Sequence, residues 1–115
     1  MRVRILMVCL GNICRSPLAQ GIMNSLTSNL VDVDSAGIIA HHIGHLPDSR
    51  SIKVAAKHGV DLSNQKARLF NPHKDFKDFD HIFVMDESNY QHICQKAGSL
   101  EDVGCRLSHG EIEHL

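Results

Sequence analysis

Residues 3–19 read VRILMVCLGNICRSPLA, and this segment contains clear signals for a strand, a loop and a helix. The run Ile5–Val8 is apolar without alternation, which predicts a strand buried on both faces, as strands of parallel sheets are. Ser16 followed by Pro17 predicts a helix start, with Ser16 as the N-cap and proline at the first helical position. A buried strand, a short loop and a capped helix form the first half of a strand-helix-strand unit.

The first helix is predicted to bury one apolar stripe. Apolar residues recur there at every fourth position, and the stripe consists of Leu18, Ile22, Leu26 and Leu30. Further strands are predicted over residues 31–37 and 81–85, and a fourth over residues 103–107.

Two more helices follow the second and third strands. Asp48 is predicted to cap a helix that ends at Gly59, with a buried face of Ile52, Ala55 and Ala56. Asp86 is predicted to cap another, which ends at Gly98 and buries Tyr90, Ile93, Cys94 and Ala97. Residues 61–78 are predicted to be irregular, with a break at Asn71-Pro72.

Alternating strands and helices predict an α/β fold in a single domain, residues 1–115. The sheet is expected to be parallel, with about four strands and helices on both faces. In such a sheet the carboxyl ends of the strands share one edge, where ligands bind near a topological switch point. Cys9, Ser35 and Asp86 come at or near the three clear strand ends, so this edge is the predicted site.

Composition narrows the class of protein. Lys and Arg number 12 against 13 Asp and Glu, which argues against a nucleic-acid partner. No apolar run approaches the ~20 residues of a membrane span, so no membrane partner is expected.

The four cysteines lack C-x-x-C spacing and predict free thiols in a reducing compartment, the cytoplasm. The cluster His41, His42 and His45 is interpreted as a polar rim; zinc is the alternative, and no metal or cofactor is expected.

The loop after the first strand has the pattern Cys9, five residues, Arg15, Ser16. Five residues can curl so that their N–H groups point inward and bind an oxyanion, toward which the following helix directs its positive end. Arg15 offers a planar fork that matches two phosphate oxygens. Cys9 at the base of this ring is predicted to be a thiolate nucleophile for phosphoryl transfer, with the Ser16 hydroxyl bonded to its sulfur.

Residues 8–17, VCLGNICRSP, closely resemble the phosphate loop of low-molecular-weight protein tyrosine phosphatases. Three further segments match the family in order: Asp34-Ser35-Ala36-Gly37 with Gly44 and residues 47–50, residues 58–63 with Lys66-Ala67-Arg68, and residues 85–89. The resemblance implies a flavodoxin-like fold. It also implies metal-free hydrolysis of phosphotyrosine, in a protein or a small aryl phosphate, through a cysteinyl-phosphate.

The resemblance also implies individual roles. Cys9 would be the nucleophile and Arg15 the phosphate clamp. The loop amides would come from Leu10, Gly11, Ile13 and Cys14. Asn12 would hold the shape of the loop through Ser35. Asp86 matches a family position near the loop, although a plain N-cap explains it equally well.

Three departures from the family stand out. The family's general acid is an aspartate in an Asp-Pro motif, but the three prolines here follow Ser16, Leu46 and Asn71. The C-terminal part of the family domain is expected to be missing, and the acid is unknown. Substitutes without a motif to recommend them are Glu101, Asp102, Glu111 and Glu113. In addition, His41 stands at the substrate rim where the family often has tryptophan, and Gln65 replaces a histidine that supports the loop.

Other interpretations remain open from the sequence. A phosphate-binding or truncated domain with impaired catalysis fits the missing acid. A thiol-dependent arsenate reductase would need Cys94 and Cys105 as relay cysteines. Arginine phosphatases share the loop but usually carry threonine at position 13, where Ile13 favours a flat aryl phosphate. Cys14 is either a partner for a reversible disulfide with Cys9 or a small core residue.

Overall fold

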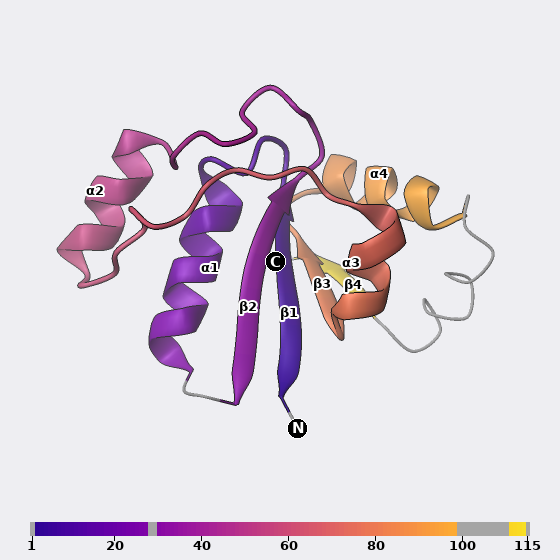
Figure 1. The fold of residues 1–115 in the computed structure, drawn as a ribbon, viewed down its shortest axis with the longest axis horizontal. Helices are drawn as coiled ribbons and strands as arrows, with labels where there is room; N and C mark the ends of the chain where they lie inside the picture. Colours follow the sequence, from indigo (N-terminus) through magenta and orange to yellow (C-terminus); the bar gives the residue numbers. More distant parts are fainter. Residues whose placement is uncertain (1, 28–29, 99–110, 115) are drawn as a thin grey trace.

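The computed structural model describes residues 2–27, 30–98 and 111–114. Its elements, in chain order, are β1 (Val3–Cys9), α1 (Arg15–Leu26), β2 (Val31–Gly37), α2 (Ser49–Lys57), α3 (Pro72–Asp78), β3 (His81–Val84), α4 (Glu87–Gly98) and β4 (Glu111–His114). The four strands form one sheet in the order β2-β1-β3-β4, and each neighbouring pair is parallel. The predicted parallel α/β sheet is therefore confirmed (Figure 1).

Helices cover the sheet on both faces. Leu6 and Val8 of β1 belong to a buried cluster with Phe76 of α3 and Ile93 of α4. Because side chains alternate along a strand, Ile5 and Met7 point to the opposite face. On that side α1 packs against β1 and β2, and α2 packs against α1. The core is therefore split by the sheet, and β1 is buried on both sides as its apolar run predicts.

The carboxyl ends of the strands meet at the switch point of this topology. The chain leaves β1 toward β2 on one side, while β3 pairs on the other side of β1. The β1–α1 loop lies at this end of the sheet, and the segments 38–48 and 58–71 pass over it (Figure 1). The Ile38 N–H donates to the Leu10 carbonyl at 2.8 Å, which joins the end of β2 to the loop after β1.

The structure corrects two predictions for α1. The helix begins at Arg15 with Cys14 as its N-cap, so Ser16 is not the cap and its hydroxyl is used elsewhere. The predicted stripe is partly buried only at its start: Leu18 packs against the cluster of Ala55, Val60 and Leu62, but Ile22 is 43% and Leu26 78% exposed, and Leu30 lies beyond the helix. The fully buried residues of α1 are the small ones, Ser16, Pro17 and Gly21, and a Cβ at Gly21 would collide with the Leu62 side chain. The close approach that glycine permits decides which face is buried.

The later elements follow the predictions with further exceptions. Asp48 caps α2 and Gly59 follows it with a φ of +77°, as predicted, but Ala56 is exposed. The segment 61–78 is not wholly irregular, since α3 begins at Pro72 with the Asn71 side chain accepting from the His73 N–H. This is a proline-led, capped start that the sequence contains. The fourth strand predicted at 103–107 lies outside the described residues, and β4 occupies 111–114.

Candidate active site

The loop between β1 and α1 is held in a tight curl. Asn12 has a φ of +59°, the left-handed region that few residues other than glycine adopt. Gly37, at the end of β2, lies directly behind it. A Cβ at Gly37 would lie 2.8 Å from the Gly11 carbonyl carbon and 2.9 Å from the Asn12 nitrogen. The loop therefore rests on β2 at a distance that only glycine permits.

Cys9 stands at the base of this loop and is only 3% exposed. Its Sγ lies 3.0 Å from the Oγ of Ser16, which is fully buried in the first turn of α1. The sulfur therefore lies close to the N-terminus of α1, where the helix dipole favours negative charge. A sulfur atom, a hydroxyl group and a helix N-terminus thus meet at the base of the loop.

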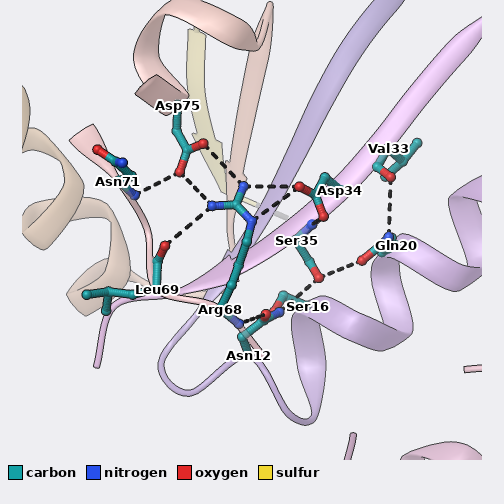
Figure 2. A network of polar contacts seen from close by, with 10 residues as sticks. All are labelled: Asn12, Ser16, Gln20, Val33, Asp34, Ser35, Arg68, Leu69, Asn71 and Asp75. Carbon is teal, nitrogen blue, oxygen red and sulfur yellow. Dashed lines mark hydrogen bonds and ion pairs between the residues drawn. The ribbon is translucent and has the colours of Figure 1, made fainter. Parts of the chain in front are cut away.

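The side chain of Asn12 connects the Cys9–Ser16 pair to β2 and to the chain at Arg68. Its Oδ1 accepts from the Arg68 backbone N–H at 3.0 Å, and its Nδ2 donates to Ser16 Oγ at 2.7 Å and to Ser35 Oγ at 2.9 Å (Figure 2). A backbone N–H can only donate, so the oxygen of the amide must face Arg68. The Asn12–Ser35 contact that the family resemblance implies is present in the structure.

Arg15 and Asp86 join the loop to the start of α4. The Arg15 Nη1 lies 2.9 Å from Asp86 Oδ2, and both side chains are a little under half exposed. The other oxygen of Asp86 accepts from the Asn89 N–H at 2.8 Å. That backbone N–H, together with the Arg15 guanidinium, holds the pKa of Asp86 below its ordinary value. Asp86 is thus a helix cap and a partner of Arg15 at once.

Arg68 is the residue that sequence reasoning missed. Its guanidinium binds the buried carboxylate of Asp75 through two N–H groups and also pairs with Asp34 on β2 (Figure 2). Burial opposes its charge, but the hydrogen bonds and charges of Asp75 and Asp34 raise its pKa above the ordinary value. These contacts fix the position of the chain at Arg68, whose backbone N–H donates to Asn12. In the sequence, Arg68 stands out only as the last residue of the matching segment Lys66-Ala67-Arg68, and that match assigned it no role.

Residues 38–48 lie beside the loop after β1, to which Ile38, Ile39 and Asp48 are hydrogen-bonded. His41 is exposed there, and the neighbouring His42 is the side chain that lies against the loop: a Cβ at Gly11 would be 2.8 Å from His42 Cδ2. The rings of His42 and His45 have centroids 5.8 Å apart. Gln65 donates from Nε2 to the Pro17 carbonyl at 3.1 Å, so it supports the start of α1.

The remaining candidates from the sequence are three cysteines and four acidic residues. Cys14 is exposed and accepts from Ser51 Oγ, so it is not a core residue. Cys94 lies on α4 as a free thiol, and Cys105 is outside the described residues. Among the general-acid candidates, Glu111 and Glu113 belong to β4, and Glu101 and Asp102 are outside the described residues.

Two further properties concern the described part of the chain. Within residues 2–27, 30–98 and 111–114, no group of three or more His, Cys, Asp or Glu side chains is placed to hold a metal ion. In the same ranges, every helix is too short or too polar to cross a bilayer.

A buried cysteine at the base of a tightly curled loop, at the switch point of a parallel sheet, is the arrangement expected of a phosphatase of the family that the sequence resembles. Residues 4–108 match the family described as low molecular weight phosphotyrosine protein phosphatase. The chain belongs to this family. The family resemblance found in the sequence is therefore confirmed.

Two relatives show how far the similarity extends. Low molecular weight phosphotyrosine protein phosphatase 2 of Drosophila melanogaster is 47% identical over 90 residues, which are 74% of this chain and 54% of that protein. The low molecular weight phosphotyrosine protein phosphatase of Gallus gallus is 37% identical over 108 residues, which are 90% of this chain and 67% of that protein. The chain thus spans between about half and two thirds of these relatives.

Solved structures give the same picture of the fold. The crystal structure of YfkJ from Bacillus subtilis superposes with a TM-score of 0.87 at 33% identity, covering 99% of this chain and 70% of that one. A Drosophila arginine phosphatase superposes with a TM-score of 0.84 at 32% identity, covering 99% and 70%.

Proposed function

We propose that this chain carries the nucleophile and the oxyanion site of a protein-tyrosine phosphatase. Its substrate would be phosphotyrosine in a protein, or a small aryl phosphate monoester. The observation that carries the proposal is the contact of 3.0 Å between Cys9 Sγ and Ser16 Oγ, beneath a loop that ends in Arg15. The family membership of the chain supports it.

The reaction proceeds in two displacements. The Cys9 thiolate attacks phosphorus, the S–P bond forms, and the P–O bond to the aryl group breaks with its electron pair leaving on the phenolic oxygen. That oxygen takes up a proton. Water then attacks phosphorus, the S–P bond breaks, and inorganic phosphate leaves while sulfur regains its negative charge. A hydroxyl that donates to the sulfur stabilises that charge, so Ser16 aids departure in the second displacement.

The remaining loop residues act on the phosphoryl oxygens. Backbone N–H groups of Leu10, Gly11, Ile13 and Cys14 would face these oxygens, as the resemblance implies, and the Arg15 fork would bind two of them. Asp86 holds Arg15 at the mouth of the loop until substrate arrives. Asn12 and Ser35 maintain the loop geometry. His41 would lie at the rim that receives the remainder of the substrate.

None of the site residues described above is assigned as the general acid that protonates the leaving group. A positioned acid contributes about 10²–10⁴-fold to the rate. We therefore expect measurable turnover of para-nitrophenyl phosphate, whose leaving group needs no proton. Phosphotyrosine peptides should be slower by at least roughly 10²-fold, in line with that contribution. Phosphoarginine should not be hydrolysed, because Ile13 favours a flat aryl group.

The test measures release of inorganic phosphate from these three substrates by the chain as it stands. Cys9→Ser should abolish turnover, because a neutral hydroxyl without a base is a poor nucleophile. Cys94→Ser is the matched control and should leave the rates unchanged, since Cys94 lies on α4. Equal rates on the two aryl substrates would instead mean that a carboxylate of this chain already serves as the acid.

The competing function is that of a phosphate-binding domain without catalysis. It is favoured by one observation, the absence of any Asp-Pro pair in the sequence. Tight vanadate binding with no turnover of para-nitrophenyl phosphate would establish it and refute the phosphatase.

We also assign the protein to the cytoplasm, where a reducing environment keeps Cys9 a thiol. The described cysteines Cys9, Cys14 and Cys94 form no disulfide.

A further inference from the structure

The hydrogen bond between Cys9 and Ser16 leaves open which atom donates. The direction matters, because a hydroxyl that donates to sulfur stabilises a thiolate, while a thiol that donates to oxygen does not. Asn12 answers part of the question. Its Nδ2 carries hydrogens and no acceptor site, so both Ser16 and Ser35 must accept from it.

The second end of the network lies on α1, at Gln20. Its Nε2 donates to the Val33 carbonyl at 3.3 Å, and its Oε1 lies 2.6 Å from Ser35 Oγ (Figure 2). A carbonyl can only accept, so the amide nitrogen must face Val33 and the oxygen must face Ser35. The single proton of Ser35 is therefore committed to Gln20.

The two ends agree on one direction of hydrogen bonding. Ser35 gives its proton to Gln20, which leaves its oxygen to accept from Asn12, and the other hydrogen of Asn12 goes to Ser16. Ser16 then has its own proton for the sulfur at 3.0 Å. Asn12, Ser16 and Ser35 are at most 5% exposed, so water competes little for these bonds.

We infer that Gln20 is a positioning residue for the Cys9 nucleophile, acting through Ser35, Asn12 and Ser16. The inference rests on the proposed role of Cys9. Gln20 supplies the acceptor that holds the Ser35 proton away from Asn12. Without it the Ser35 hydroxyl turns to find another acceptor, the Asn12 amide loosens, and Ser16 donates less strongly to the sulfur.

The test is the pH profile of Cys9 alkylation by iodoacetamide, read by mass spectrometry of the Cys9 peptide. Gln20→Met keeps the length of the side chain but removes the amide. Gln20 lines an open cavity of about 570 Å³, so methionine has room there. We expect the midpoint of alkylation to rise by about 0.5 pH unit, a threefold loss of thiolate at lower pH, because the lost bond is two links from the sulfur.

Two further variants make the test specific. Gln91→Met removes an exposed glutamine of α4 that bonds only to Glu87 among the contacts described, and should leave the midpoint unchanged. In a Ser35→Ala background, Gln20→Met should add no further shift, because its route to the sulfur is already broken. An unchanged midpoint in Gln20→Met overturns the inference, and so does a full shift that persists without the Ser35 hydroxyl.

The outcome is independent of the proposed hydrolysis. Alkylation needs no turnover, so a chain that releases no phosphate from any aryl ester can still show the shift. That result would remove the phosphatase proposal and leave Gln20 as a positioning residue of a reactive thiol. Normal turnover without the shift would do the reverse.

Discussion

Replacing Arg68 by methionine tests how much the ion pair between Arg68 and Asp75 stabilises the fold. This pair holds the chain at Arg68, which contacts the β1–α1 loop through Asn12. The Asp75 carboxylate is 1% exposed and accepts from Arg68 Nη1 at 3.0 Å, Arg68 Nη2 at 3.2 Å and the Asn71 N–H at 2.8 Å. Arg68→Met leaves a buried charge with one donor. Removing one partner of a buried pair costs about 3–5 kcal/mol.

The lower end of that range applies here. The Arg68 side chain is 33% exposed, so water reaches part of the vacated position, and the Asn71 N–H remains. We expect the free energy of unfolding to fall by about 3 kcal/mol. With a urea slope of about 2 kcal/mol/M, the unfolding midpoint should fall by about 1.5 M.

Two variants in the same urea titration check the cause. Arg50→Met breaks an exposed pair with Asp48, in which the Arg50 side chain is 88% exposed, and should not move the midpoint measurably. Asp75→Asn in the Arg68→Met background removes the buried charge and keeps an acceptor for Asn71, so it should restore much of the lost stability. If Arg68→Met unfolds like Arg50→Met, or if the double variant is no more stable than Arg68→Met, the reasoning is wrong.

Three further changes probe the loop itself. Arg15→Lys keeps the charge but loses the fork, and should weaken vanadate binding by roughly tenfold or more, measured by titration against wild type; equal affinity would remove Arg15 from the site. Gly37→Ala places a Cβ against the loop backbone and should cost vanadate affinity while the chain still folds, checked by circular dichroism alongside the titration; unchanged affinity would contradict the close approach. The lowered pKa of Asp86 means that its contribution to stability is present above its unfolded pKa and is lost as the pH falls through the folded value. Asp86→Asn should therefore flatten the acid side of the urea midpoint against pH, and an unaltered profile would refute this.

Local signals in the sequence were sufficient for most of the fold. The apolar run of β1, the Asp48 cap and the Gly59 stop of α2, and the Asp86 start of α4 each depend on neighbours a few residues away. Backbone preference and periodicity act over that range, so they can be recognised without coordinates. The spacing of Cys9 and Arg15 is local in the same sense, because one loop carries both.

The sequence alone was therefore sufficient for the first three strands, for α1, α2 and α4, for the parallel sheet and for the loop that carries Cys9, but not for α3. Tertiary structure alone decided which face of α1 is buried, because close packing at Gly21 outweighs the apolar stripe through Ile22 and Leu26. It also decided the direction of the hydrogen bonds that reach Ser16. These depend on Arg68, 56 residues from Asn12, whose backbone N–H can only donate and thereby orients the Asn12 amide. Contacts over that distance in sequence leave no periodic pattern, so they become visible only when the chain is folded.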